Sequence, residues 1–126
     1  MAQVRTKPVS DLEVEISQAI IRFEKESMGR GPFETRTYLL DDMILVRLKG
    51  VLLPAEIKLA EAEDNGRARL LLKEVRRTIL ERSRPLLESV ILDIVGVPVQ
   101  SVHTDISTRT GERVIIFTLK GKPAGS

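Results

Sequence analysis

The chain has 126 residues, no cysteine and one histidine, with 42% hydrophobic and 30% charged residues. This length and balance are typical of one folded domain and argue against wholesale disorder. Without cysteine there is no disulfide, thiol nucleophile or cysteine-ligated metal, and one histidine excludes a histidine-rich metal site. No apolar run approaches the roughly 20 residues that span a bilayer, and the N-terminus lacks a secretory signal, so we predict a cytoplasmic protein.

The first predicted element is an amphipathic helix over residues 10–28. Ser10 and Glu13 have the spacing of a capping box at its start. The positions that recur at helical spacing on one side are Leu12, Ile16, Ala19, Ile20, Phe23 and Ser27. The charged positions that fall largely away from them are Glu13, Glu24, Lys25 and Glu26. Gly29 suits a left-handed helix end, and Pro32 prevents the helix from resuming.

Two strands and a short helix are predicted next. Residues 33–40 and 43–49 read as a hairpin around Asp41-Asp42, because short polar side chains tolerate turn conformations. Pro54 then suits the first position of a helix over 54–63. The residues expected to be buried by this helix are Ile57, Leu59 and Ala60.

A basic helix follows and resumes to Val95, with Pro85 expected to kink or split it. Residues 67–84 hold seven basic and two acidic residues, the one marked asymmetry of charge. The predicted apolar stripe is Ala68, Leu72, Val75, Ile79, Leu86 and Val90. Beside it, within about 100° around the helix, lies a set that we name the basic helix face: Arg69, Lys73, Arg76, Arg77 and Arg84.

A second hairpin, over 97–107 and 112–119 with a turn at Arg109-Thr110-Gly111, completes the pattern. The predicted fold is α+β: two αββ-like halves forming a four-stranded antiparallel sheet, covered by helices on one face. We expect a flexible arm at 1–9, one domain at 10–120 and a solvated tail at 121–126. Apolar residues left on the other sheet face suit a homodimer.

The short motifs give little sign of catalysis. Gly29-Arg30-Gly31-Pro32 follows a helix and matches no phosphate-binding fingerprint, and Asp41-Asp42 reads as a turn. His103 and Asp105 share one strand face, but no serine has the setting of a nucleophile elbow. We therefore expect a non-enzymatic protein with no cofactor, metal site or catalytic residue.

The basic helix face has two open interpretations. It is either a solvated surface with weak local pairs to Glu74 and Glu81, or a docking site for protein, anionic lipid or nucleic acid. Only four aromatic residues are present, which disfavours single-strand recognition by stacking. The candidate partner-binding residues are Arg69, Lys73, Arg76, Arg77, Arg84, Gly29, Arg30, Gly31 and Pro32.

Several segments, taken in order, resemble the MpsC-domain family of small prokaryotic proteins, long listed as a domain of unknown function. They are Gly29-Arg30-Gly31-Pro32, Thr37-Tyr38, Asp42–Gly50, Leu53-Pro54-Ala55-Glu56 with Leu59-Ala60, Arg76-Arg77 and Gly96-Val97-Pro98-Val99. They cover roughly residues 10–120. The family name associates these proteins with sodium-translocating systems that generate membrane potential, linked to uptake of inorganic carbon.

The resemblance implies an accessory or regulatory binding domain beside a membrane ion or inorganic-carbon transport system. It supplies no catalytic residues. Such a protein is expected in the cytoplasm, with peripheral association to the inner face of the membrane left open, and with a transporter subunit as partner. The alternative is a nucleic-acid-binding module that uses the basic helix face.

Overall fold

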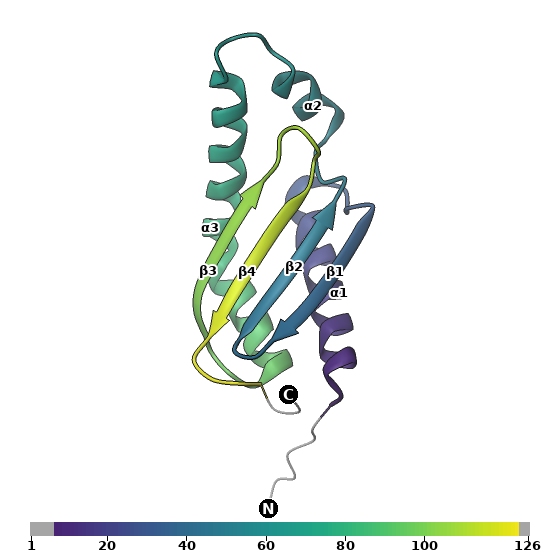
Figure 1. Ribbon diagram of the computed structural model, residues 1–126, viewed down its shortest axis with the longest axis vertical. Coiled ribbons are helices and arrows are strands. Elements are labelled where there is room, and N and C mark those ends of the chain that lie inside the picture. Colours follow the sequence, from purple (N-terminus) through teal and green to yellow (C-terminus); the bar gives the residue numbers. More distant parts are fainter. Residues whose placement is uncertain (1–6, 124–126) are drawn as a thin grey trace, which may run out of the picture.

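The computed structural model describes residues 7–123 and has the predicted α+β fold. The sheet is antiparallel with strand order β1-β2-β4-β3, so β2 and β4 pair at its centre and β1 and β3 form its edges. The long helices α1 and α3 lie behind the sheet in Figure 1 and cover one face, while its other face is open. The elements are α1 (Val9–Met28), β1 (Glu34–Leu40), β2 (Met43–Lys49), α2 (Pro54–Ala60), α3 (Arg67–Val95), β3 (Val99–Ile106) and β4 (Arg113–Leu119).

The start of α1 differs from the predicted capping box. The helix begins at Val9 after Pro8, and no side chain caps it. The Glu13 carboxylate instead accepts a hydrogen bond of 2.8 Å from the backbone amide of Leu39 on edge strand β1. Satisfying an edge amide in this way reduces the exposure of an unpaired strand edge. Glu13 therefore holds α1 against the sheet.

The hairpins form where the sequence places them. Asp41 adopts a left-handed conformation with φ of 60° in the β1–β2 turn, which confirms the turn interpretation of Asp41-Asp42. Gly29 ends α1 with φ of 81°, as predicted. The sheet residues that face the helices form the core with apolar residues of α1 and α3. Fully buried members from the strands include Ile44, Val46, Leu48, Ile115 and Phe117.

The buried side of α3 differs from the predicted stripe. Leu72, Arg76, Leu80 and Leu87 are buried, whereas Leu86 is 64% exposed. The other wrong assignment in this helix is Val75, which is also exposed. Arg76 occupies a core position four residues from both Leu72 and Leu80. A charged residue there removes the apolar signal from the true stripe, so the sequence pattern favours a neighbouring face.

Pro85 does not split α3, which continues from Arg67 to Val95. A proline deprives the helix of one amide and crowds the preceding turn. Here its exposed position keeps the ring on the solvent side, while Leu80 and Leu87 pack into the core on either side of it. Burial of both flanking turns stabilises one continuous helix despite the missing hydrogen bond.

The ends of the chain lie partly outside the described residues. Residues 1–6 of the predicted arm and 124–126 of the predicted tail are outside them. Within the described part, Lys7 forms an ion pair of 2.9 Å with Glu15 on α1. Lys122 forms an ion pair of 2.9 Å with Asp41, so the start of the tail contacts the β1–β2 turn.

Candidate functional site

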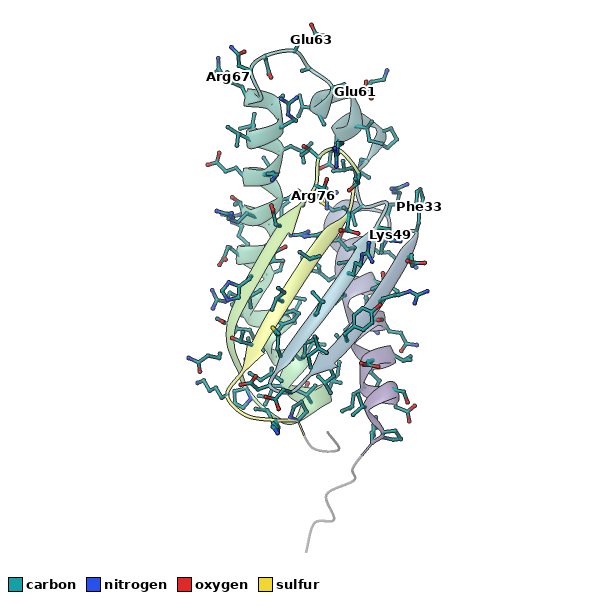
Figure 2. The ribbon with its side chains drawn as sticks, in the orientation of Figure 1. Phe33, Lys49, Glu61, Glu63, Arg67 and Arg76 are labelled. Carbon is teal, nitrogen blue, oxygen red and sulfur yellow. The ribbon has the colours of Figure 1, made fainter. Side chains whose placement is uncertain are left out.

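Four charged side chains, Glu24, Glu56, Arg76 and Arg113, meet between the helices and the sheet. We name them the charge cluster. Arg76 is 1% exposed and Arg113 2% exposed, among the largest fully buried side chains of the protein. Glu24 is also buried, and Glu56 lies at the rim with a side chain 15% exposed. Figure 2 labels Arg76 at the upper ends of β3 and β4.

Arg76 is bound on several sides. Its Nε and Nη2 donate to the two Glu56 oxygens at 2.9 and 2.7 Å, a bidentate pair. Nη2 also donates to the Val51 carbonyl at 2.5 Å, and Nη1 donates to Glu24 Oε1 at 3.4 Å. Planar forked pairing of this kind suits arginine better than lysine. Arg76 thereby ties α3 to α1, to α2 and to the loop that follows β2.

Glu24 joins the two arginines. Arg113 Nη1 donates to Glu24 Oε2 at 3.2 Å, and its Nε donates to the Thr104 hydroxyl at 3.2 Å. Two arginines and two glutamates balance in formal charge, which is what allows ions to remain buried. The cluster therefore links α1, α2, α3, β3 and β4 at one point.

Burial and pairing shift two pKa values of the cluster. Burial lowers the pKa of Arg113, although the nearby Glu24 carboxylate opposes the shift. For Glu56, burial acts to raise the pKa, but hydrogen bonds from Arg76 and from the Leu53 amide outweigh it. The pKa of Glu56 consequently lies below its usual value, and the carboxylate stays ionised at neutral pH.

The basic helix face is not one continuous exposed surface. Arg76 belongs to the charge cluster and is not accessible, which corrects its assignment as a partner-binding candidate. Arg69 donates to the Ala60 carbonyl at 3.2 Å, and Lys73 lies 3.3 Å from Asp105 across the edge of β3. Arg84 pairs with Glu88 at 2.6 Å, with Glu81 also near. Arg77 is exposed, and among the described residues no ion pair engages it.

A small cavity of about 20 Å³ lies between α3 and β3, beside the basic helix face. Its walls include Lys73, Arg77, Thr104 and Asp105. A volume of this size suits about one water molecule. A hydrogen bond from the Ile106 amide is the main cause that lowers the pKa of the exposed Asp105; slight desolvation opposes it, and the nearby Lys73 adds to the lowering.

The remaining sequence candidates do not converge on one another. His103 is exposed and lies 3.1 Å from the Ser101 hydroxyl, whereas Asp105 turns to Lys73. Asp41 and Asp42 lie at the opposite hairpin and contact Lys122 and the Leu119 amide. Within residues 7–123, no group of three or more His, Asp or Glu side chains is placed to hold a metal ion.

The Gly29–Pro32 segment leads into a larger hollow. Arg30 Nη2 donates to the carbonyls of Gly50 and Leu52 at 2.6 and 3.1 Å, and its guanidinium lies 5.1 Å from the centre of the Phe33 ring. Phe33 is 80% exposed. Gly50 has φ of 70°, and a Cβ there would lie 2.2 Å from the Phe33 ring. Arg30 and Gly50 therefore hold Phe33 at the edge of the hollow.

This hollow, which we name the terminal groove, has a volume of about 410 Å³. It runs between the Arg30–Phe33 pair, α2 and the β3–β4 turn, where the Gly111 carbonyl accepts from the Val51 amide. Its side chains are Arg30, Phe33, Leu52, Pro54, Ile57, Thr108, Arg109 and Thr110. Two arginines and no acidic residue line it. A second hollow of about 410 Å³ adjoins it through Ile57, Thr108 and Arg109.

Arg30 is a partner-binding candidate of the sequence analysis that lines this groove, whereas Phe33, Ile57 and Arg109 were not among the candidates. Ile57 was expected to be buried, yet it is exposed because α2 ends at Ala60 and projects past the end of the sheet. The signal available was indirect: a phenylalanine directly after Gly-Arg-Gly-Pro, and an arginine in a turn. Neither signal indicates that the Gly29–Pro32 turn and the β3–β4 turn lie side by side in the fold.

The fold and the charge cluster define a two-layer α+β domain with mutually paired ions in its interior. The chain belongs to the family described as Na+-translocating membrane potential-generating system (MpsC), whose profile matches residues 9–121. This confirms the resemblance found in the sequence. The chain is similar to "Uncharacterized protein YbcI" of Bacillus subtilis (strain 168), with 42% identity over 113 residues, or 90% of this chain and 89% of the relative. No solved structure matches it.

The described residues contain three helices, α1, α2 and α3. Across residues 7–123, none of them combines the length and apolar character needed to cross a membrane.

Proposed function

We propose that the chain is a non-enzymatic accessory domain that acts by binding another protein through the terminal groove. The observation that carries the proposal is the lining of that groove. Its lining combines the apolar side chains of Phe33 and Ile57 with the arginines Arg30 and Arg109, and contains no acidic side chain. Exposed aromatic and arginine side chains are the residue types that most often anchor protein interfaces.

The side chains that line the terminal groove indicate which kind of peptide segment would bind there. A segment that places an apolar side chain against Phe33 and a carboxylate near Arg109 would satisfy both parts of the groove. Arg109 has no ion pair among the described residues, and the adjoining hollow, which Arg109 also lines, contains the acidic side chain of Glu61. Arginine offers bidentate donors to a carboxylate, which favours an acidic peptide segment over an uncharged one. We infer that the partner presents an acidic segment that contains apolar residues.

The family description associates these proteins with a sodium-translocating system that generates membrane potential. We propose that the partner is a subunit of such a system, and that this domain binds the subunit from the cytoplasmic side and regulates it. Support for a binding role in place of catalysis comes from the charge cluster. Its ionisable groups bind one another, and through the bond from Arg113 to Thr104 on β3 the cluster joins five elements.

Nucleic-acid binding through the basic helix face has less support. Phosphate binding needs a run of accessible cations. Arg76 is buried, and Lys73 and Arg84 already have carboxylate partners within the chain. Among the described residues, Arg69 and Arg77 are the cations of that face with no ion pair, and Arg69 already donates to the Ala60 carbonyl.

The test is site-specific photocross-linking in native cells. A photoreactive phenylalanine analogue replaces Phe33 in the groove, and matched variants carry it at Glu26 on the exposed side of α1 and at Arg77 on α3. We expect an adduct at position 33 that is absent at 26 and 77, with an acidic, apolar-containing segment as the cross-linked peptide. An adduct at 77 but not at 33, or a cross-linked segment without acidic residues, would overturn the proposal.

A further inference from the structure

The open face of the sheet carries an ordered arrangement of side chains that the terminal groove does not use. Strand register places outward-facing residues in rows across β1, β2, β4 and β3. The central row is Tyr38, Leu45, Ile116 and His103. Next to it, towards the β1–β2 turn, lies the row Leu40, Met43, Thr118 and Ser101. This end of the face is therefore mainly apolar.

The other end of the face is charged and divided by sign. On the β1–β2 half, Arg36, Arg47 and Lys49 outnumber Glu34. On the β3–β4 half lie Asp105 in β3 and Glu112 just before β4. Over these six residues the formal charge is two positive on one half and two negative on the other, and one charge of each half, Arg47 and Glu112, already pair within the chain at 2.6 Å.

From this arrangement we infer that the open face is an interface between two copies of this chain, packed sheet against sheet with the two-fold axis parallel to the strands. Such an axis places β1 over the partner's β3 and β2 over the partner's β4. A two-fold interface must be self-complementary, because the same surface appears on both sides. The positive half of each copy then meets the negative half of the other.

The individual pairings agree with this axis. Leu45 lies opposite the partner's Ile116 at the centre, where apolar contact contributes most. Arg36 lies opposite the partner's Asp105, and Lys49 opposite the partner's Glu112. Asp105 keeps a side chain 70% exposed despite its pair with Lys73, so it remains accessible to a second cation.

A two-fold axis across the strands would be unfavourable. It would place β1 over the partner's β1 and the charged end of each face over the apolar end of the other. Arginine and lysine side chains would then lose water without gaining a carboxylate. Charge and apolar character thus favour the same one of the two face-to-face arrangements.

The area of the open face can be compared with the area that a stable interface buries. Four strands about 4.8 Å apart and seven residues rising about 3.4 Å each give a face of about 450 Å² before side-chain relief. A stable interface removes about 800 Å² of accessible surface from each partner. Contact over the whole face, side chains included, is therefore required, and stacked sheets about 10 Å apart allow it.

The first experiment is sedimentation equilibrium of the full chain between 1 and about 100 µM. We expect a dimer, and we expect Ile116→Lys, at the centre of the face, to raise the dissociation constant by about 30-fold or more. The matched control is Val75→Lys, which adds the same charge on the exposed side of α3 and should leave the dimer intact. A monomer throughout this range would overturn the inference, as would a dimer disrupted by Val75→Lys and not by Ile116→Lys.

A second experiment does not depend on Ile116→Lys folding. The chain has no cysteine, so an Arg36→Cys and Asp105→Cys double variant contains only the two introduced thiols. Within one copy these positions lie three strand spacings apart, about 14 Å, which is too far for a disulfide. Facing residues of sheets about 10 Å apart are also too far for a direct disulfide, so the reagent is a short bismaleimide. We expect it to give a covalent dimer from the double variant and none from either single variant. Failure to cross-link, or equal cross-linking of a single variant, would overturn the pairing of β1 with the partner's β3.

Discussion

Replacing Glu24 by leucine removes the carboxylate that bridges Arg76 and Arg113. Both guanidiniums are almost fully buried, so water cannot take the place of the lost partner. Removing one partner of a buried ion pair costs about 3–5 kcal/mol, because a charge remains without compensation. With an unfolding entropy of about 2.1 cal/mol/K per residue, this cost lowers the Tm by about 11–19 °C for a chain of this length.

The assay is thermal and urea unfolding followed by circular dichroism, with two matched variants. Arg84→Ala removes a surface pair with Glu88 on α3 and should cost less than about 1 kcal/mol. The double variant Glu24→Leu/Arg113→Met removes one charge of each sign and restores the balance of the cluster. We expect it to be more stable, by about 1 kcal/mol or more, than the sum of the two single changes implies.

Two results would refute the reasoning. One is a Glu24→Leu protein within about 1 kcal/mol of the wild type, which would mean that the cluster contributes no more than a surface pair. The other is strict additivity of Glu24→Leu and Arg113→Met, which would mean that the two charges do not depend on one another.

Three further outcomes follow from the structure. The ordinary pKa of Glu56 is 4.5 and folding lowers it, so its contribution to stability is complete above pH 4.5 and is lost as the pH falls through the lowered value. Glu56→Gln should therefore reduce the loss of stability at acid pH, measured by urea unfolding at a series of pH values. An unchanged dependence of stability on pH would contradict this. Gly50→Ala should cost about 1–3 kcal/mol in thermal unfolding, because the new Cβ meets the Phe33 ring at a positive φ, and a neutral effect would be inconsistent with that contact. Leu80→Ala should cost about 2–5 kcal/mol and Leu86→Ala about 0.5 kcal/mol at most; the reverse order would restore the predicted stripe of α3.

Local signals in the sequence were sufficient for most of the architecture. Alternation along residues 43–49 identifies β2 because one face of that strand is wholly apolar. Gly29 and Asp41 mark chain reversals that demand unusual backbone conformations, and both were placed correctly. These signals depend on neighbouring residues alone, which is why they can be read without knowledge of the tertiary structure.

The charge cluster could not be predicted in the same way, because its members are far apart in the sequence. Glu24 was assigned to the exposed side of α1 on charge alone, yet it follows Ile16 and Ile20 at intervals of four and is buried with them. Arg76 stands similarly between Leu72 and Leu80. The available signal was a charged residue at a position that continues the helical spacing of buried apolar residues. Only the fold shows that two such residues of opposite sign meet.

The terminal groove depends on two turns that local patterns place but do not bring together. Gly29–Pro32 ends α1, and the turn at 108–111 joins β3 to β4. They become neighbours because β2 and β4 pair at the centre of the sheet and the loop after β2 lies between the turns. That pairing is a long-range event, so the groove emerges only with the sheet.

The most direct test of the functional account compares two arginines in one binding measurement. The acidic segment captured at position 33 is titrated by calorimetry into the wild type and into the variants Arg109→Glu and Arg77→Glu. A like charge placed against a carboxylate costs several kcal/mol, so we expect Arg109→Glu to weaken binding more than 10-fold and Arg77→Glu to leave it unchanged. Loss of binding with Arg77→Glu and retention with Arg109→Glu would contradict the account and assign recognition to the basic helix face.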